Sequence, residues 1–566
     1  MSRFSLKGLV YAAVLAVGCS LVPAQAPQDP VLSAMKAELD RSLGKLKLTG
    51  APEPYYIEYR VLDRDAYNVS ASFGALTGED RLRTRMITVT VRVGSYKRDN
   101  SFGQGANIVD LLPYENDVYA LRHAIWLATD RAYKQAVSAY AMKQSLLKRY
   151  QAEQQVDDFS HEPPVTHIGG LAKIDLGSED WPKVLTSLSG MYRDDLQLAS
   201  FTANLKFSVT NEYFANTEGS VLRKGRASYG IEVDGTTQAS DGTHLQRTYG
   251  EITPTLSEFP KPPKLESETR KVLESLKQLR AAPAISEQYE GPVLILNKAA
   301  DTLIADVVAK NIVGLPPEPG STARTSGAYA QSYKARILPA FVNIVDDPTL
   351  SAFKGEGLLS NYDYDDEAVK AQKIDVVDKG ELVNYLTNRQ PIRDFTESNG
   401  HGRALFTMYG GAATPTPSTL VVSSAQAKPF AELKQKLIEL CKDQGLPYAY
   451  YVEEMASPAP SPLSLDQSEA PDGTFVPQLL YRIYADGHEE LVRGGEVANL
   501  DTRALRSNLM MLGDDQFLEG AGGEDAPVGI IAPSMLFGDL VVRPSESGKD
   551  KLPQYPPPSL VAKTIH

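Results

Sequence analysis

The C-terminal half of this chain is organised around the stretch YEGPVLILNKAADTLIADVVAKNIVG, residues 289–314. Val293 to Leu296 are all apolar, which predicts a short buried strand. Asn297 suits the N-cap of a helix, because its side-chain oxygen can accept from a free backbone N–H. Apolar residues then recur at helical spacing as far as Gly314 and predict a helix with one buried face. A strand that runs directly into a helix holds free N–H groups at a fixed point, which suits a chemical site.

This stretch resembles the strand–helix joint of the TldD/PmbA family, the metallopeptidase-related proteins also called modulators of DNA gyrase. The resemblance implies that the helix of active members carries His-Glu-x-x-x-His, in which both histidines bind zinc and the glutamate acts as a base. In this sequence the three positions are Asn297, Lys298 and Thr302. An amide, an ammonium and a hydroxyl are poor zinc ligands. The resemblance therefore implies the PmbA-like branch, which lacks the zinc motif.

Further landmarks of the family follow in the same order. They are the aspartate-bearing strand end Ile344–Leu350, Asp365-Asp366-Glu367-Ala368, His401-Gly402-Arg403 and Pro527-Val528-Gly529. In zinc-binding members a cysteine ahead of the Pro-Val-Gly supplies the third ligand, and residues 520–526 contain none. Because all three implied ligands are missing, we expect no metal, no cofactor and no catalytic residue on this template. Whether the chain is an enzyme stays open.

The landmarks supply a candidate cleft made of Asp365, Asp366, Glu367, His401 and Arg403. The carboxylates lack the spacing of a calcium loop, which favours a structural or cleft-edge role in a solvated turn over a cation site. His401 lies among glycine and asparagine, which favours an exposed loop. The alternative is that His401 and Arg403 together meet a peptide carboxylate.

Two other segments offer metal-ligand types. His161 and His167 flank a Glu and two prolines, which prevent an ordinary helical turn, so an exposed linker with solvated histidines is expected. Cys441 falls in an amphipathic helix pattern and is expected to be a small core residue.

The 566 residues exceed what one hydrophobic core usually supports. We predict an α+β protein, with an N-terminal α/β domain, a β-rich middle domain and a large β-rich C-terminal domain of TldD/PmbA type. The expected segments are a signal peptide at 1–24, domains at 25–160, 161–285 and 286–544, and a disordered tail at 545–566. Predicted helices span Val31–Leu46, Asn116–Gln151 and Glu266–Ala281. Predicted strands span Tyr55–Leu62, Arg85–Val93, Leu198–Val209, Glu212–Asn216, Val221–Tyr229 and Tyr229–Thr237.

The first residues are typical of an export signal, with a basic start, an apolar stretch from Leu9 to Val17 and small residues at 22–24. This pattern predicts a periplasmic protein. The alternative is a lipoprotein, because Leu15 to Cys19 form a loose lipobox that would leave Cys19 lipidated. Only Cys19 and Cys441 are present, so a chain cleaved after residue 24 has no internal disulfide.

The net charge of −13 argues against a nucleic-acid surface, which needs a basic face. The resemblance implies a zinc-less, non-catalytic subunit that pairs with an active TldD-like protease, or with its own copies, and helps hold a peptide substrate. The alternatives are a metallopeptidase with a non-standard metal site and a stand-alone extracytoplasmic binding protein.

Overall fold

The protein is described here from a computed structural model, which covers residues 29–101, 107–150, 156–318, 320–404, 412–456, 473–521, 526–545, 549 and 551–558. The expected signal peptide, the lipobox with Cys19 and much of the expected tail lie outside the described residues. Among these residues, no helix is both long and apolar enough to cross a membrane.

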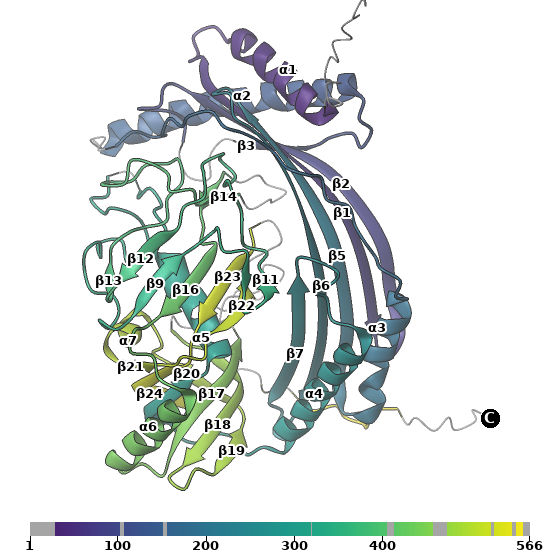
Figure 1. Ribbon diagram of the computed structural model, residues 1–566, viewed down its shortest axis with the longest axis vertical. Coiled ribbons are helices and arrows are strands. Elements are labelled where there is room, and N and C mark those ends of the chain that lie inside the picture. Colours follow the sequence, from purple (N-terminus) through teal and green to yellow (C-terminus); the bar gives the residue numbers. More distant parts are fainter. Residues whose placement is uncertain are drawn as a thin grey trace, which may run out of the picture.

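A seven-stranded, strongly curved sheet runs along the whole length of the molecule (Figure 1). Its strand order is β3-β2-β1-β5-β6-β4, and β7 also pairs with β6. The strands are β1 (Pro54–Ser72), β2 (Ala75–Val93), β3 (Asn107–Leu111), β4 (Thr166–Ile168), β5 (Leu198–Asn216), β6 (Val221–Gln238) and β7 (His244–Thr253). β1, β2, β5 and β6 are antiparallel neighbours of 18 or 19 residues each. The expected boundary between residues 160 and 161 falls inside this one sheet.

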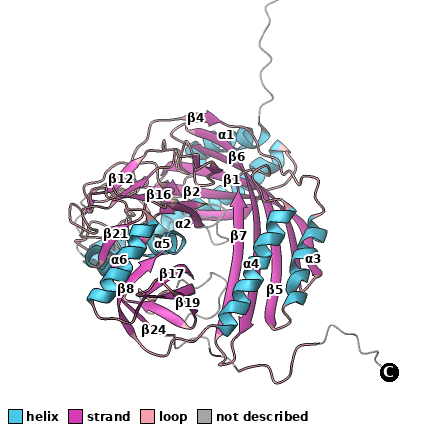
Figure 2. Cartoon of the chain, turned by 60° about the horizontal axis from the view of Figure 1, so that its bottom comes forward, coloured by secondary structure: helices cyan, strands magenta, loops and turns pink. Residues whose placement is uncertain are grey.

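Alternation along the strands gives the large sheet two different faces. Odd-numbered residues such as Tyr59, Val69 and Phe207 are apolar and pack beneath four helices. The helices are α1 (Pro30–Lys45), α2 (Val118–Tyr150), α3 (Trp181–Gly190) and α4 (Pro262–Ala281). α3 and α4 lie side by side at the right of Figure 2, and α1 lies at its top. Even-numbered residues such as Arg60 and Lys224 are charged and lie toward the C-terminal domain, where both contact Asp366.

The C-terminal domain contains two further large sheets. The first has the order β19-β18-β17-β8-β24-β20, with β21 paired to β24. Its strands are β8 (Tyr289–Ile295), β17 (Tyr448–Ala456), β18 (Val476–Tyr484), β19 (Glu489–Val492), β20 (Gly495–Ala498), β21 (Leu509–Leu512) and β24 (Met535–Pro544). The second has the order β13-β12-β9-β16-β23-β22. Its strands are β9 (Asn343–Asp346), β12 (Ile374–Asp378), β13 (Glu381–Leu382), β16 (Thr419–Ser423), β22 (Phe517–Ala521) and β23 (Val528–Ala532).

Two short pairs of strands and two further helices also belong to this domain. They are β10 (Ala352–Phe353) with β11 (Glu356–Gly357), β14 (Gly402–Arg403) with β15 (Thr414–Pro415), α6 (Phe430–Asp443) and α7 (Thr502–Ser507). α6 packs on the first sheet through Leu433, Leu437 and Cys441. Cys441 is 1% exposed, which confirms the expectation of a core residue. The α+β fold class is confirmed as well.

The strand–helix joint is present at the centre of this domain. β8 ends at Ile295, and α5 (Asn297–Leu303) follows almost at once. The helix then widens to a π-turn over Ile304–Val308 and ends as a 3₁₀ turn at Asn311, short of the expected end at Gly314. Its apolar residues are buried in the largest core, between the two sheets. The N-cap differs from the expectation, because Leu296 occupies that position and Asn297 is the first helical residue.

Candidate functional site between the sheet and the C-terminal domain

The three positions of the zinc motif lie together at the start of α5, and each side chain contacts protein groups. Asn297 donates from Nδ2 to the carbonyl of Asp515 at 2.8 Å and accepts the Lys298 N–H at 2.7 Å. The Thr302 hydroxyl lies 3.5 Å from the Met455 carbonyl oxygen. These side chains therefore link α5 to β17 and to the turn before β22.

Lys298 is part of an ion cluster that joins the joint to the large sheet. Its Nζ lies 2.8 Å from Oε1 of Glu454 on β17, and the other oxygen of Glu454 pairs with Arg247 of β7. Burial acts to raise the pKa of Glu454, but hydrogen bonds and charge from Arg247 and Lys298 outweigh it, and the pKa is lowered. Glu454 is therefore ionised between two cations.

Zinc does not fit the groups at this joint. Zinc sites use histidine, thiolate or carboxylate ligands, and the motif positions offer an amide, an ammonium and a hydroxyl. The carboxylate that contacts the motif positions directly is that of Glu454, and it is already paired with Lys298 and Arg247. Nowhere in the described residues do three or more His, Cys, Asp or Glu side chains gather as a metal site would require. Residues 522–525, part of the segment where the family resemblance implied a cysteine, lie outside the described part of the chain.

The acidic landmark occupies the interface between the C-terminal domain and the charged face of the large sheet. Asp365, Asp366 and Glu367 are 1%, 8% and 4% exposed. Asp365 accepts the N–H groups of Glu367, Val369 and Gly402, and Glu367 accepts the N–H of Arg389. The expected solvated turn is therefore wrong, because these carboxylates are buried and bonded to main chain.

The three carboxyls differ in protonation. Burial raises the pKa of Asp365 to about 7. Burial, together with the neighbouring charge of Asp365, raises the pKa of Glu367 to about 8. Burial would also raise the pKa of Asp366, but the positive charges of Lys224, Arg60 and Arg403 outweigh it and hold that pKa below the usual range. Asp366 is therefore the one of these three carboxyl groups that stays ionised at neutral pH.

His401 is fully buried, so the expectation of an exposed loop histidine is wrong. Its Nε2 lies 3.1 Å from Oδ1 of Asp346, and its Nδ1 lies 2.9 Å from Oδ1 of Asn399. Ser418 donates to the same Asp346 carboxylate from its hydroxyl and its N–H. This network fastens β14 to the strand ends of β9 and β16.

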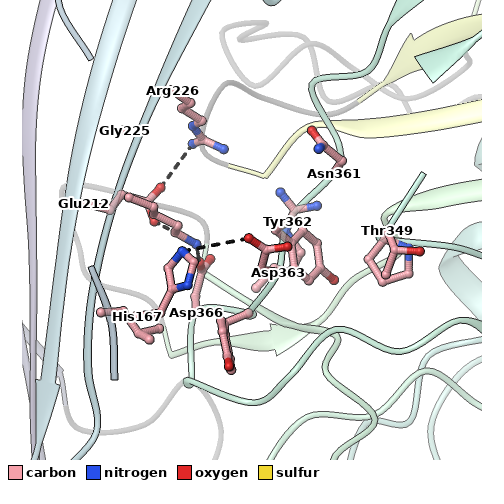
Figure 3. Close-up of a pocket in the computed structure, with 14 residues that line it drawn as sticks. His167, Glu212, Gly225, Arg226, Thr349, Asn361, Tyr362, Asp363 and Asp366 are labelled. Carbon is pink, nitrogen blue, oxygen red and sulfur yellow. Dashed lines mark hydrogen bonds and ion pairs between the residues drawn. The ribbon is translucent and has the colours of Figure 1, made fainter. Parts of the chain in front are cut away.

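A cavity of about 270 Å³ opens between β5 and β6 of the large sheet and the loop of residues 348–364 (Figure 3). Of the five expected cleft residues, Asp366 and Arg403 line it, while Asp365, Glu367 and His401 do not. The opposite wall is formed by Glu212, Lys224 and Arg226, none of which was predicted as a site residue. The pattern that could have identified them is the alternation of charged and apolar residues along β5 and β6. A polar face on a long buried strand needs a polar partner.

His167 also lines this cavity. It lies on β4, and its Nε2 is 3.8 Å from Asp363 at the rim. His161 is exposed, as expected, but His167 is half-buried. The two histidines have different neighbours, because the ring of His167 lies 5.4 Å from that of Tyr364 and the ring of His161 lies 5.5 Å from that of Tyr96.

Comparison with known proteins places these features in context. Residues 287–543 match the family model for the PmbA/TldA metallopeptidase C-terminal domain. A stretch of 131 residues is 28% identical to Metalloprotease MJ0996 of Methanocaldococcus jannaschii, and it spans 23% of this chain and 26% of that protein. The match thus covers about a quarter of the relative's length.

Solved structures resemble the whole fold. TldE from Thermococcus kodakarensis superposes with a TM-score of 0.58 and 12% identity, over 90% of this chain and all of the other. A putative modulator of a DNA gyrase from Thermotoga maritima gives 0.57 and 14% over the same shares. A putative modulator of DNA gyrase from Bacteroides thetaiotaomicron gives 0.56 and 11%, over 91% and 98%. These likenesses establish a common architecture from the large sheet to the C-terminal domain.

Proposed function

Since this chain belongs to the TldD/PmbA family of metallopeptidase-related proteins, we propose that it is an exported, non-catalytic subunit without zinc. It pairs with an active TldD-like protease and helps to hold the peptide that the protease cuts. A homo-oligomer is the alternative assembly.

One observation carries this proposal. At the joint where the family resemblance implies a zinc site, the chain presents Asn297, Lys298 and Thr302, and their polar groups contact protein atoms. An ammonium fixed 2.8 Å from Glu454 adds a positive charge beside the position that a cation would take. Two like charges there would repel, so the joint supports a structural role better than a catalytic one.

A peptide-holding role is supported by β7. Among the described strands β7 pairs with β6 alone, so its other edge presents main-chain N–H and C=O groups. Such an edge can accept an extended peptide as an additional strand. Arg247, on this same strand, joins the ion cluster of the joint through Glu454. The unpaired edge of β7 therefore belongs to the strand that contacts the strand–helix joint, so a peptide added to this edge would lie near the joint.

Export is proposed from the leader-like first residues, with release after residue 24 favoured over lipid attachment at Cys19. Mass spectrometry of the protein purified from its native cell envelope distinguishes the two, since lipidation adds diacylglycerol and an acyl chain to a new N-terminal cysteine.

The test is purification of the full chain from the native cell envelope, followed by metal analysis and peptidase assays on the isolated chain, its partner and the mixture. We expect a co-purifying homologue with His-Glu-x-x-x-His, no stoichiometric zinc on this chain, and more activity in the mixture than in the partner alone. Stoichiometric zinc together with peptidase activity in the isolated chain would instead support the metallopeptidase alternative. A monomer that binds peptide without any protease would support the stand-alone binding protein.

A further inference from the structure

Arg403 presents an unused hydrogen-bonding edge in the cavity between the large sheet and the C-terminal domain. Arg403 is 4% exposed as a whole residue and lines the cavity. Nη1 donates to the Pro527 carbonyl at 2.8 Å, and the guanidinium carbon lies 4.9 Å from the centre of the Tyr362 ring. Within the described residues, Nε and Nη2 donate to no protein acceptor. Neither atom is among the fully buried polar atoms without a partner in the described residues, so both reach the space of the cavity, where an acceptor on a ligand can meet them.

The charged side chains around Arg403 leave the interior of the cavity positive, although the wall as a whole has three cations and three carboxylates. Three cations line it, namely Arg403, Lys224 and Arg226. Two carboxylates beside them are buried: Glu212, which pairs with both β6 cations, and Asp366, which lies 2.7 Å from the Lys224 nitrogen. The remaining carboxylate, Asp363, is at the rim with 80% of its side chain exposed. The interior of the cavity therefore has one positive charge in excess.

The shape limits what can enter. A volume of about 270 Å³ is just below the roughly 300–1,000 Å³ typical of small-molecule sites. The cavity thus suits one or two residues at the end of a chain better than an extended segment. Leu222, Pro348 and Tyr364 supply apolar wall for a terminal side chain.

We propose that this cavity binds a carboxylate on the free edge of Arg403, and that the carboxylate is the C-terminus of a peptide. Nε–H and one Nη2–H of arginine lie parallel and match the two oxygens of a carboxylate. The inference rests on the proposed peptide-holding function and deepens it, because it names the end of the peptide that this chain recognises. Arg403 is a binding residue here, and no chemical step is assigned to it.

Calorimetry with the full-length protein tests the proposal. The probes are N-acetyl-trialanine with a free carboxylate, the same peptide as its C-terminal amide, and acetate. We expect the acid to bind at least tenfold more tightly than the amide, because charge-assisted hydrogen bonds are lost with the charge. Equal binding of acid and amide, or no binding of either at millimolar concentration, would overturn the inference.

Two variants act on the site independently. Arg403→Met removes the fork and should abolish the preference for the acid, while Arg403→Lys keeps the charge without the fork and should retain a small part of it. Asn361→Asp places a negative charge on an exposed residue of the cavity wall and should weaken acid binding severalfold with no change for the amide. Because Asn361 is exposed, this second variant keeps the test valid even if Arg403→Met fails to fold.

Arg193→Met is the matched control. Its guanidinium also lies over a tyrosine ring, at 5.0 Å from Tyr192, but it lines no part of this cavity. It should leave acid and amide binding unchanged, and an equal loss there would overturn the assignment to Arg403.

The outcomes separate this inference from the proposed function. If acetate binds as tightly as the peptide acid, the carboxylate site is supported and its assignment to a peptide end is overturned. Peptide binding that ignores the terminal charge would leave the subunit role standing and remove the carboxylate site. Acid-selective binding by a protein that associates with no protease would support the site and remove the subunit role.

Discussion

Arg389 and Glu218 form a bidentate ion pair that fastens the C-terminal domain to the turn between β5 and β6. Both Nη–Oε distances are 2.7 Å. The Arg389 side chain is fully buried, and Glu218 is 6% exposed. Arg389 also donates to the Ser160 carbonyl and lies 4.0 Å over the Phe159 ring. The interface is therefore held by a desolvated charge pair, and such pairs are sensitive to loss of one partner.

Arg389→Met should destabilise the protein by about 3–5 kcal/mol, because it leaves the Glu218 carboxylate buried without a counter-charge. The measurement is urea unfolding at neutral pH. The double variant Arg389→Met with Glu218→Gln should recover part of the loss, since no unpaired charge remains.

Arg81→Met is the control for this pair. Arg81 makes a similar bidentate ion pair with Asp65, but 53% of its side chain is exposed. The expected loss in the free energy of unfolding is therefore about 0–1 kcal/mol. Equal costs for Arg81→Met and Arg389→Met would show that burial does not set the strength of the interface.

Glu367 should make the protein less stable in alkali. Burial and the charge of Asp365 raise its pKa to about 8, above the ordinary glutamate value that the unfolded chain restores. The folded state therefore favours the protonated form. Its stabilising contribution is complete below about pH 4.5 and is lost as the pH rises through about 8.

Glu367→Gln removes this titration, and glutamine can still accept the Arg389 N–H through its amide oxygen. The variant should gain stability relative to the parent between pH 5 and pH 9, by an amount of order a few kcal/mol at about 1.4 kcal/mol per pKa unit. Unfolding at pH 5, 7 and 9 measures it, with exposed Glu287→Gln as the control. A difference that stays constant across this range would contradict the assignment.

The sequence predicted where helices and strands occur better than it predicted which segments form one continuous strand. The long helix expected at Asn116–Gln151 is α2, found at Val118–Tyr150, because its periodicity is local. Leu198–Val209 and Glu212–Asn216 were expected as two strands, but they form the single strand β5. Thr210 and Asn211, which lie between the two predicted strands, continue the ladder to Arg64 and Asp63 of β1.

The contacts of the interface could not be predicted from neighbouring residues in the sequence, for a related reason. The side chains that pair with Asp366 come from β1 and β6, 306 and 142 positions away in the chain. Three adjacent acids are most simply a solvated turn when their partners are unknown. The joint was recognisable because strand and helix are consecutive in sequence, whereas the use of Lys298 depends on Glu454 and Arg247 from two other strands.

His401 should stabilise the protein through its buried contact with Asp346. Asn399 donates from Nδ2 to the Tyr385 carbonyl, which fixes its Oδ1 toward the imidazole as an acceptor. The two ring nitrogens of His401 are thus held between Asn399 and Asp346.

A double-mutant cycle tests this pair. His401→Gln and Asp346→Asn should each cost about 1–3 kcal/mol in urea unfolding, because each leaves a buried hydrogen-bonding group without its partner, and the double variant should cost less than their sum. Strictly additive losses would contradict a direct interaction between the two. His123→Gln, at an exposed position of α2, should change stability by no more than about 0.5 kcal/mol.

Glu454 should matter more to stability than Lys298, although both belong to one cluster. Lys298 is 41% exposed, so Lys298→Met loses a screened contact worth about 1 kcal/mol or less. Glu454→Gln leaves Arg247 uncompensated, and Arg247 is only 9% exposed, so the expected cost is about 3–5 kcal/mol.

The pH dependence has the opposite sign to that of Glu367. The pKa of Glu454 is lowered on folding, so its stabilising contribution is present above about pH 4.5 and is lost as the pH falls below that value. Thermal unfolding of the parent, Lys298→Met and Glu454→Gln at pH 4 and pH 7 measures both effects. The gap between the parent and Glu454→Gln should narrow at pH 4. A larger loss for Lys298→Met than for Glu454→Gln would mean that the ammonium, and not the carboxylate, organises the joint.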